Sequence, residues 1–321
     1  MLKSDVLYYS RQDSLGNLDP YFEKLLDDLI DKEIYPNVNV LQQTGTEIEK
    51  ELQNYRKLHT LDTAVIGLSG GVDSALTAAI FKNAGWNVKP VLLPIHQNPV
   101  ETERALQTAK ALGLESEVID LTHTFDRILK DVKTYDTNID KDRIRSGNIR
   151  VRLRMMTLYN LASKYRGLVA STDNFSELAA GFWTLHGDVG DLAPIQSLCK
   201  SWEVPKLAEY YGVPNNTVMA KPTDGLGISA GDEDQFGFSY LELDLVLLTL
   251  CSGLQPYTFE NIFYNLNVPA HLESKVHAIL KRIKNSAFKR NNPCNIKHPY
   301  QTNRFSGLGD LDSCLINSTL K

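Results

Sequence analysis

Cysteine is sparse in this chain of 321 residues: four occur, at Cys199, Cys251, Cys294 and Cys314, each isolated from the others. No pair has CxxC spacing, so the sequence predicts neither a structural zinc site nor a redox dithiol. We expect reduced, buried thiols that behave as small apolar side chains.

Long apolar runs and an excess of basic residues are also missing. The longest apolar stretches, such as residues 245–248, are far too short to span a bilayer. Residues 1–10 lack the apolar core and basic flank of a signal peptide. The formal net charge is −5, which argues against a general polyanion binder. We therefore expect a cytoplasmic protein that binds neither membranes nor nucleic acid.

What the chain does contain is an alternation of short apolar runs and helical patterns. Hydrophobic residues make up 42% of it, enough for one large core. Runs rich in β-branched residues predict strands at residues 63–68, 88–94, 116–119 and 167–171. Apolar residues at helical spacing predict helices at residues 74–84, 101–112 and 148–164. Strands that alternate with helices over short connections predict an α/β fold with a doubly wound parallel sheet.

Helical patterns flank this predicted sheet at both ends of the chain. Residues 21–30 and 48–58 carry apolar side chains at helical spacing, and helices dominate from about Ser239 onward. The N-terminal segment, residues 1–60, is expected to be an extension of the main domain or an element that mediates oligomerisation. We expect a helical extension, a main domain and a tail at residues 1–60, 61–300 and 301–321.

A glycine-rich turn lies between the first predicted strand and the helix that follows it. Its residues are Gly67, Leu68, Ser69, Gly70, Gly71, Val72, Asp73 and Ser74, which we call the phosphate loop. Glycines allow a sharp turn and close approach to a ligand, and free N–H groups at a helix start favour an anion. Asp73 would repel bare phosphates, so we expect a bridging Mg²⁺. The Gly-Lys-Ser/Thr ending of a Walker A loop is missing.

The SGGVDS sequence of the phosphate loop resembles the signature of the ATP-pyrophosphatase superfamily. The resemblance implies a Rossmann-like sheet of the adenine nucleotide alpha hydrolase type. It also implies that all eight loop residues bind ATP, which is cleaved between its α- and β-phosphates. The alternative is a tight strand-to-helix turn whose glycines are accidental.

Later blocks resemble those of the ammonia-dependent NAD synthetases, in the same order. They are GNIRVRLRM at residues 147–155, STDNFSE at 171–177, GFWTLHGD at 181–188, D…P…L…K at 191–200, KPTD at 221–224 and SAFKR at 286–290. The resemblance runs from about Leu61 to Pro293. It implies adenylation of the nicotinate carboxylate of deamido-NAD, followed by amidation with ammonia, in a homodimer.

The same resemblance implies roles for single residues. Thr172, Lys200 and Thr223 are expected to bind ATP, and Glu177 to join Asp73 on Mg²⁺. A lysine near the phosphates would offset the charge of the leaving pyrophosphate. We expect Asp73 and Lys200 to be catalytic on these grounds.

Recognition of the second substrate is expected to involve Arg152, Asp191 and Lys289, again by resemblance. A guanidinium suits a bidentate contact with an oxyanion. Ammonium is not a nucleophile, so a carboxylate is needed to release ammonia. Asp173 is our candidate for this third catalytic role.

One position departs from the family pattern. Leu185 stands where family members commonly have a lysine that contacts deamido-NAD, and the stretch at residues 187–191 is one residue shorter than usual. This departure concerns the recognition of the nicotinate ribose and not the reaction. Arg150 and Arg154 share a helix face and are candidates to replace the missing charge.

Two other functional classes stay open. One is a different amidating or thiolating pyrophosphatase, such as a GMP synthetase or a tRNA thiolase. The lack of a glutaminase-like segment and of basic excess disfavours both. The other is a non-catalytic nucleotide-binding module, which would not need Asp73, Glu177 and Lys200 together. The glycine-rich stretch at residues 223–238 is expected to close over ATP, the alternative being a surface loop.

Overall fold

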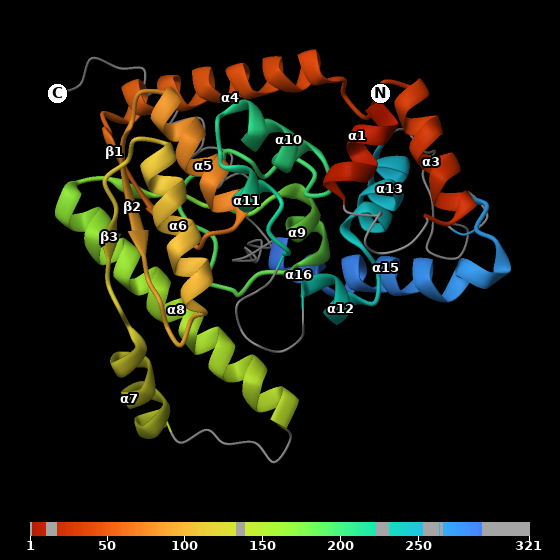
Figure 1. The fold of residues 1–321 in the computed structure, drawn as a ribbon. Coiled ribbons are helices and arrows are strands. Elements are labelled where there is room, and N and C mark those ends of the chain that lie inside the picture. The colour runs from red at the N-terminus through yellow and green to blue at the C-terminus, as the bar shows by residue number, and fades with distance from the viewer. Residues whose placement is uncertain are drawn as a thin grey trace, which may run out of the picture.

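A parallel four-stranded sheet in the order β3-β2-β1-β4 lies at the centre of the computed structural model (Figure 1). The structure describes residues 2–10, 18–132, 139–222, 231–252, 263 and 266–290. The strands are β1 (Thr63–Gly67), β2 (Asn87–Leu92), β3 (Glu117–Val118) and β4 (Leu168–Val169). Ala64 of β1 lies opposite Val88 of β2 on one side and Leu168 of β4 on the other. The predicted parallel sheet is confirmed.

Helices cover both faces of this sheet because β1 is apolar on both sides. Ala64 and Ile66 pack into the core that contains α5 (Val72–Asn83), whereas Val65 between them packs into a second core with α8 (Ile139–Tyr165). Successive strand residues point to opposite faces, so a fully buried strand requires this two-sided cover. The predicted helix at residues 148–164 is the second half of the longer α8.

The remaining helices of the sheet region are α6 (Pro99–Ala111), α7 (Thr122–Val132), α9 (Phe175–Ala180), α10 (Glu203–Tyr210), α11 (Asn215–Val218) and α12 (Asp232–Phe236). Strands and helices alternate as predicted as far as α6 and β3, but several helices follow one another after β4. The strand predicted at residues 167–171 is shorter in the sheet, and Ala170 after it forms a parallel bridge with Leu192. No described helix is long and apolar enough to cross a membrane.

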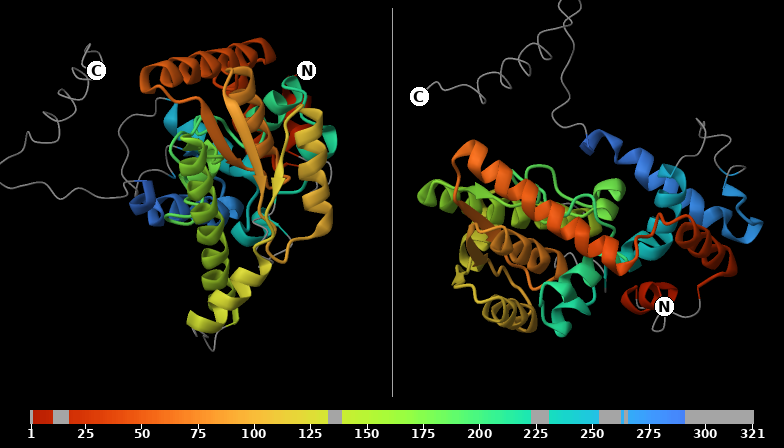
Figure 2. Two further views of the ribbon diagram at one scale, coloured as in Figure 1. Left: turned by 90° about the vertical axis from the view of Figure 1, so that its left-hand side faces the viewer. Right: turned by 90° about the horizontal axis from the view of Figure 1, so that it is seen from above.

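The additional helices at the two ends of the chain are α1 (Leu2–Tyr9), α3 (Pro20–Asp31) and α4 (Val38–His59) at the beginning, and α13 (Tyr240–Cys251), η1 (Ala270–Leu272), α15 (Glu273–Asn285) and α16 (Ala287–Arg290) at the end. Part of the N-terminal helices and the C-terminal helices pack together, whereas α4 lies against α5 and α10 of the sheet region. α13 packs against both α3 and α15, and Figure 2 shows α1, α3, α13 and α15 grouped beside the sheet. The predicted helices at residues 21–30 and 48–58 fall within α3 and α4.

The N-terminal helices share their core with the sheet region. Phe22 of α3 and Leu41 of α4 belong to the same buried cluster as Ala64 of β1. α4 begins earlier than predicted because the Asn37 side chain caps it, accepting hydrogen bonds from the N–H groups of Asn39 and Val40. The domain boundary at residue 60 stays a prediction, and the tail at residues 301–321 lies outside the described residues.

The two described cysteines are both free thiols. Cys199 is buried, as predicted, but Cys251 is exposed, which corrects that expectation. It is the last residue of α13, where the helix leaves the core. Cys294 and Cys314 lie outside the described residues.

Candidate functional site

A cavity of about 500 Å³ opens at the carboxyl ends of β1 and β4. Its walls include Asp73 and Ser74 of the phosphate loop, Thr172 after β4, Glu177 of α9 and Lys200 before α10. Ligands of open parallel sheets bind at this edge, where backbone N–H groups and loops converge. The structure therefore brings together segments that are far apart in the chain.

The phosphate loop has the conformation that its glycines were expected to allow. Gly70 has a φ of +87°, and a Cβ added there would lie 2.4 Å from the carbonyl oxygen of Glu101. A side chain at Gly70 would therefore clash with the backbone of α6. Gly71 is the N-cap of α5, so the loop leads directly into a helix start.

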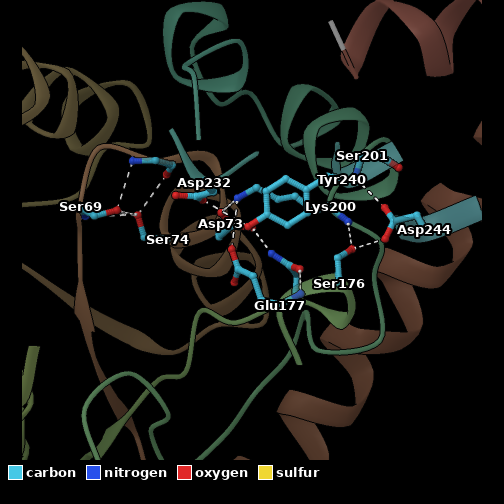
Figure 3. A network of polar contacts seen from close by, with 12 residues as sticks. Ser69, Asp73, Ser74, Ser176, Glu177, Lys200, Ser201, Asp232, Tyr240 and Asp244 are labelled. Carbon is cyan, nitrogen blue, oxygen red and sulfur yellow. Dashed lines mark hydrogen bonds and ion pairs between the residues drawn. The ribbon is translucent and has the colours of Figure 1, made fainter. Parts of the chain in front are cut away.

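Both serines of the phosphate loop bond within the loop itself (Figure 3). The hydroxyls of Ser69 and Ser74 lie 3.1 Å apart, and the Ser69 N–H donates to Ser74 Oγ at 3.2 Å. The N–H of Gly71 donates to Ser69 Oγ at 3.2 Å. These bonds hold the turn in shape before any ligand binds.

Two residues on the α6 side also support the phosphate loop and were missed by the sequence interpretation. Arg104 Nε donates to the Gly70 carbonyl at 2.5 Å, and Gln97 Nε2 donates to the Ser69 carbonyl at 3.2 Å. Both line the cavity. No motif marks them, because their role depends on how α6 packs beside the loop.

The charged centre of the cavity is Lys200, which joins two carboxylates (Figure 3). Its ammonium is in direct contact with Asp73 and lies 3.6 Å from Glu177 Oε1, and its side chain is 9% exposed. Burial alone would lower the pKa of Lys200, but the carboxylates of Asp73 and Glu177 outweigh it and raise that pKa. Burial raises the pKa of Glu177, and Lys200 opposes this. Lys200 is therefore a firmly held cation beside the phosphate loop.

Asn174 connects the carboxylate of Asp73 to the backbone of Glu177 and was not singled out from the sequence. Its Nδ2 donates to Asp73 Oδ1 at 2.9 Å, and its Oδ1 accepts the Glu177 N–H at 3.0 Å as the N-cap of α9. The signal was present, since Asn three residues before an acidic residue is typical of a helix start. One side chain thus fixes Asp73 relative to Glu177.

The carboxylates around Lys200 are the candidate ligands for a divalent cation. Among the described residues no group of three or more His, Cys, Asp or Glu side chains is arranged to hold a metal ion. Asp73 and Glu177 nevertheless converge on one cation, the ammonium of Lys200. Mg²⁺ usually binds one or two carboxylates and takes its other ligands from water and phosphates. These two carboxylates fit that pattern.

Asp173 also lines the cavity, at 4% exposure. Its carboxylate accepts hydrogen bonds from the Ser171 hydroxyl and the Gln196 amide. These two donors hold Asp173 at the end of β4. Asp232, which the sequence interpretation passed over, lines the cavity too, and Tyr240 donates to its Oδ2 at 3.2 Å.

The three residues expected to bind deamido-NAD are not gathered in one place. Lys289 lines the cavity, and its ammonium donates to the carbonyls of Gly181 at 2.7 Å and Trp183 at 2.5 Å. Arg152 and Asp191 are exposed and are not among the cavity-lining residues. Arg152 Nε donates to the carbonyl of Leu185 at 3.1 Å. Leu185, which stands where family members commonly have a lysine, therefore contacts Arg152 through its backbone carbonyl.

Arg154 and Asp188 form a second charged part of the cavity wall. Arg154 Nε donates to the Leu93 carbonyl at 3.0 Å, and burial together with Arg150 lowers the pKa of Arg154 to about 10. Burial raises the pKa of Asp188 to about 6, against the Thr184 N–H and Arg154. Of the two candidates to replace a missing lysine, Arg154 lines the cavity, whereas Arg150 lies over the Phe125 ring at 5.2 Å.

The expected lid is described only in part. Thr223 and the stretch at residues 223–230 lie outside the described residues. On either side of that stretch, Lys221, Pro222 and Gln235 line the cavity. Closure over a nucleotide stays a prediction.

Comparison with known proteins gives one consistent family. A family model described as NAD synthase matches residues 44–293. The NH(3)-dependent NAD(+) synthetase of Methanocaldococcus jannaschii is 37% identical over 248 residues, covering 75% of this chain and 93% of the relative. That of Finegoldia magna is 39% identical over 190 residues, covering 59% of this chain and 76% of the relative.

Two solved structures resemble the fold at 28% sequence identity. An NH3-dependent NAD synthetase from Campylobacter jejuni has a TM-score of 0.62 and covers 80% of this chain and 99% of its own. An NMN synthetase from Francisella tularensis has a TM-score of 0.61 and covers 73% of this chain and 95% of its own. The region matched by the family model begins at residue 44, inside α4. The motifs that carry the resemblance begin later, at about Leu61.

Proposed function

Because this chain belongs to the NAD synthase family, we propose that its cavity is the active site of an ammonia-dependent NAD synthetase. The enzyme is a C–N ligase that converts deamido-NAD, ammonia and ATP into NAD, AMP and pyrophosphate. The observation that carries the proposal is Lys200, held by Asp73 and Glu177 at the mouth of the phosphate loop. A nucleotide-binding module would not need this buried charged centre.

ATP is the substrate of the phosphate loop in this proposal. The loop N–H groups at the start of α5, the ammonium of Lys200 and the guanidinium of Arg104 supply positive potential along one wall of the cavity. Residues 67–74, Thr172, Lys200 and Thr223 are the proposed ATP contacts. The loop's internal hydrogen bonds support this, since a pre-formed site loses little entropy on binding.

Mg²⁺ is proposed as the cofactor, held by Asp73 and Glu177. When bound, the ion would neutralise charge on the ATP phosphates. Asn174 would hold the Asp73 carboxylate against the start of α9, through its bonds to Asp73 Oδ1 and the Glu177 N–H. Lys200 would stay beside them as a second positive charge.

The first chemical step needs positioning rather than a base. The nicotinate carboxylate is already ionised near neutral pH. Its oxygen attacks the α-phosphorus of ATP, the bond to the bridging oxygen of the β-phosphate breaks, and pyrophosphate leaves. Lys200 stabilises the charge that develops on pyrophosphate.

The second step is amidation. Ammonia attacks the carbonyl carbon of the acyl-adenylate, AMP leaves with the bonding electron pair, and the nitrogen releases a proton to water. Asp173 is proposed to accept a proton from ammonium beforehand, so that neutral ammonia is available. Its place in the cavity wall, fixed by Ser171 and Gln196, supports this role.

The deamido-NAD site is proposed to extend beyond one chain. Arg152 and Asp191 are exposed outside the cavity, on the same side as exposed apolar residues of α8 such as Met156, at 62% exposure, and Tyr159, at 40%. Tyr159 donates to Asp191 Oδ1 at 2.8 Å. If a second copy packed against α8, deamido-NAD could bind between the two chains and contact these residues. This arrangement agrees with the predicted homodimer. The cytoplasm stays the predicted location.

The test is an assay of substrate choice. Purified protein is mixed with MgATP, ammonium and one acceptor: deamido-NAD, nicotinate mononucleotide, XMP or tRNA. We expect NAD, AMP and pyrophosphate in equal amounts with deamido-NAD. The mononucleotide is included because one structural relative is an NMN synthetase. ADP and phosphate as products would overturn the proposal. Preference for another acceptor would show that deamido-NAD is not the substrate.

A further inference from the structure

A further carboxylate, besides Asp73 and Glu177, lies behind Lys200, on the side away from the phosphate loop. Asp244 of α13 is completely buried, at 0% exposure, and does not line the cavity. Figure 3 shows its contacts with Ser176 and Ser201. A buried carboxylate is costly unless hydrogen bonds compensate it. No step of the proposed reaction uses Asp244 directly, so its presence calls for another explanation.

The hydrogen bonds of Asp244 lead to the backbone on both sides of the catalytic lysine. Ser176 Oγ donates to Asp244 Oδ1 at 2.5 Å, and the Ser201 N–H donates to Asp244 Oδ2 at 3.0 Å. The Lys200 N–H in turn donates to Ser176 Oγ at 2.9 Å. Two successive N–H groups of the Lys200 segment are thus tied to one carboxylate, one directly and one through Ser176.

The same hydroxyl belongs to the segment that carries the second carboxylate of the active site. Ser176 directly precedes Glu177 in α9, and α9 packs against α13. Asp244 therefore stands where α9, α13 and the Lys200 segment meet. A shift of Asp244 would move Lys200 relative to Glu177, which are 3.6 Å apart at their charged atoms.

We propose that Asp244 is a positioning residue for the adenylation step, which fixes Lys200 against Glu177 through Ser176 and Ser201. The inference rests on the proposed function of the cavity. Two acceptor oxygens are required, because Ser176 and the Ser201 N–H both donate to Asp244. Asparagine has only one such oxygen. Its NH₂ group would then face either the Ser176 hydroxyl or the Ser201 N–H, both of which donate to Asp244.

The cost of keeping Asp244 ionised supports a role beyond packing. Burial raises the pKa of Asp244 to about 6, although Ser176 and Ser201 lower it. A neutral side chain of similar volume would avoid that cost. α13 is also well anchored at its start, where Ser239 and Glu242 form a capping box. The carboxylate thus projects from a rigid helix.

The experiment compares variants that cut the network at different points. Asp244→Asn removes one acceptor, Ser176→Ala removes the link to Lys200, and Ser176→Thr keeps a hydroxyl at the same place. Tyr35→Phe is the matched control, because Tyr35 OH lies 3.3 Å from the side chain of Ser201 and leaves its backbone N–H bond intact. Each variant is assayed for kcat, for KM of ATP and deamido-NAD, and for Tm.

We expect kcat to fall about thirtyfold to a hundredfold in Asp244→Asn and Ser176→Ala, since a displacement near 1 Å can cost that much. KM should change less than about threefold, because Asp244 touches no proposed ligand. Ser176→Thr should recover most of kcat, and Tyr35→Phe should keep it.

Two results would overturn the positioning role. One is a kcat of Ser176→Ala within threefold of the wild type. The other is an equal loss in Tyr35→Phe and Ser176→Ala, which would show a general loss of stability. If Asp244→Asn fails to fold, the comparison of kcat between Ser176→Ala and Ser176→Thr tests the positioning role by itself. A wild type that makes no NAD contradicts the proposed function instead, so the two failures are distinguishable.

Discussion

The side-chain amide of Asn174 donates to the carboxylate of Asp73 at 2.9 Å, across 101 positions of the chain. This bond joins the phosphate loop to the start of α9. Together with Lys200 it places two carboxylates and one ammonium at the edge of the sheet where β1 and β4 end. The reactivity proposed for this protein depends on that arrangement.

Asp73→Asn tests the charged centre. The variant keeps the shape of the side chain but removes the charge that pairs with Lys200 and would hold Mg²⁺. We expect kcat to fall about a hundredfold or more, equivalent to roughly 3 kcal/mol of transition-state stabilisation. Stability should also fall, because the buried Lys200 then loses the carboxylate with which it is in direct contact. Steady-state rates across a Mg²⁺ titration measure this, and near-native turnover at low Mg²⁺ would refute the role.

Arg104 is expected to bind the phosphates of ATP as well as the loop. Arg104→Gln should raise the inhibition constant for pyrophosphate about tenfold, or roughly 1.4 kcal/mol, while that for AMP stays within threefold. Gln97→Ala is the matched control, since Gln97 bonds the neighbouring loop carbonyl without carrying a charge. Equal effects of the two variants on pyrophosphate would mean that Arg104 only supports the loop.

Leu185→Lys tests the position at which the chain departs from its family. The Leu185 side chain does not line the cavity, and its carbonyl accepts the bond from Arg152. We therefore expect the KM for deamido-NAD to change less than about threefold, at both low and high salt. A tenfold decrease, about 1.4 kcal/mol of added binding, would instead reveal an unfilled cation site.

Glu203→Gln tests the cost of a buried carboxylate outside the cavity. Burial raises the pKa of Glu203 from 4.5 to about 7, against the Cys199 N–H that donates to its Oε2 at 2.6 Å. The folded protein therefore keeps a proton that the unfolded chain has released, so rising pH favours unfolding in this window. The stability gain of the variant over the wild type should grow between about pH 4.5 and about pH 7.

Glu209→Gln is the control of opposite sign. Hydrogen bonds from Lys206 and Tyr9 lower the pKa of Glu209, whose side chain is 55% exposed. Its small stabilisation is present above pH 4.5 and lost as pH falls, so this variant should be slightly less stable at neutral pH. Denaturant unfolding from pH 4 to pH 8 measures both variants. A pH-independent difference for Glu203→Gln would contradict the raised pKa.

The sequence by itself determined the class of fold and the nature of the phosphate loop. β1, the loop and α5 are consecutive, so the apolar run, the glycines and Asp73 form one local pattern that needs no distant partner. The two-sided burial of β1 was likewise visible as an unbroken apolar run at residues 63–68. The blocks that carry Glu177 and Lys200 were found by their order along the chain.

Only the tertiary structure decided which distant residues meet. Arg104 reaches Gly70, Asn174 reaches Asp73, and Asp244 reaches the Lys200 segment, each across more than thirty positions. A local sequence pattern does not predict such pairs, because the packing of the helices determines which distant residues are in contact. Arg152 and Arg154 make the same point. Their spacing places them on different faces of α8, but the packing of α8 on β1 and β4 decides that Arg154 faces the cavity while Arg152 stays outside.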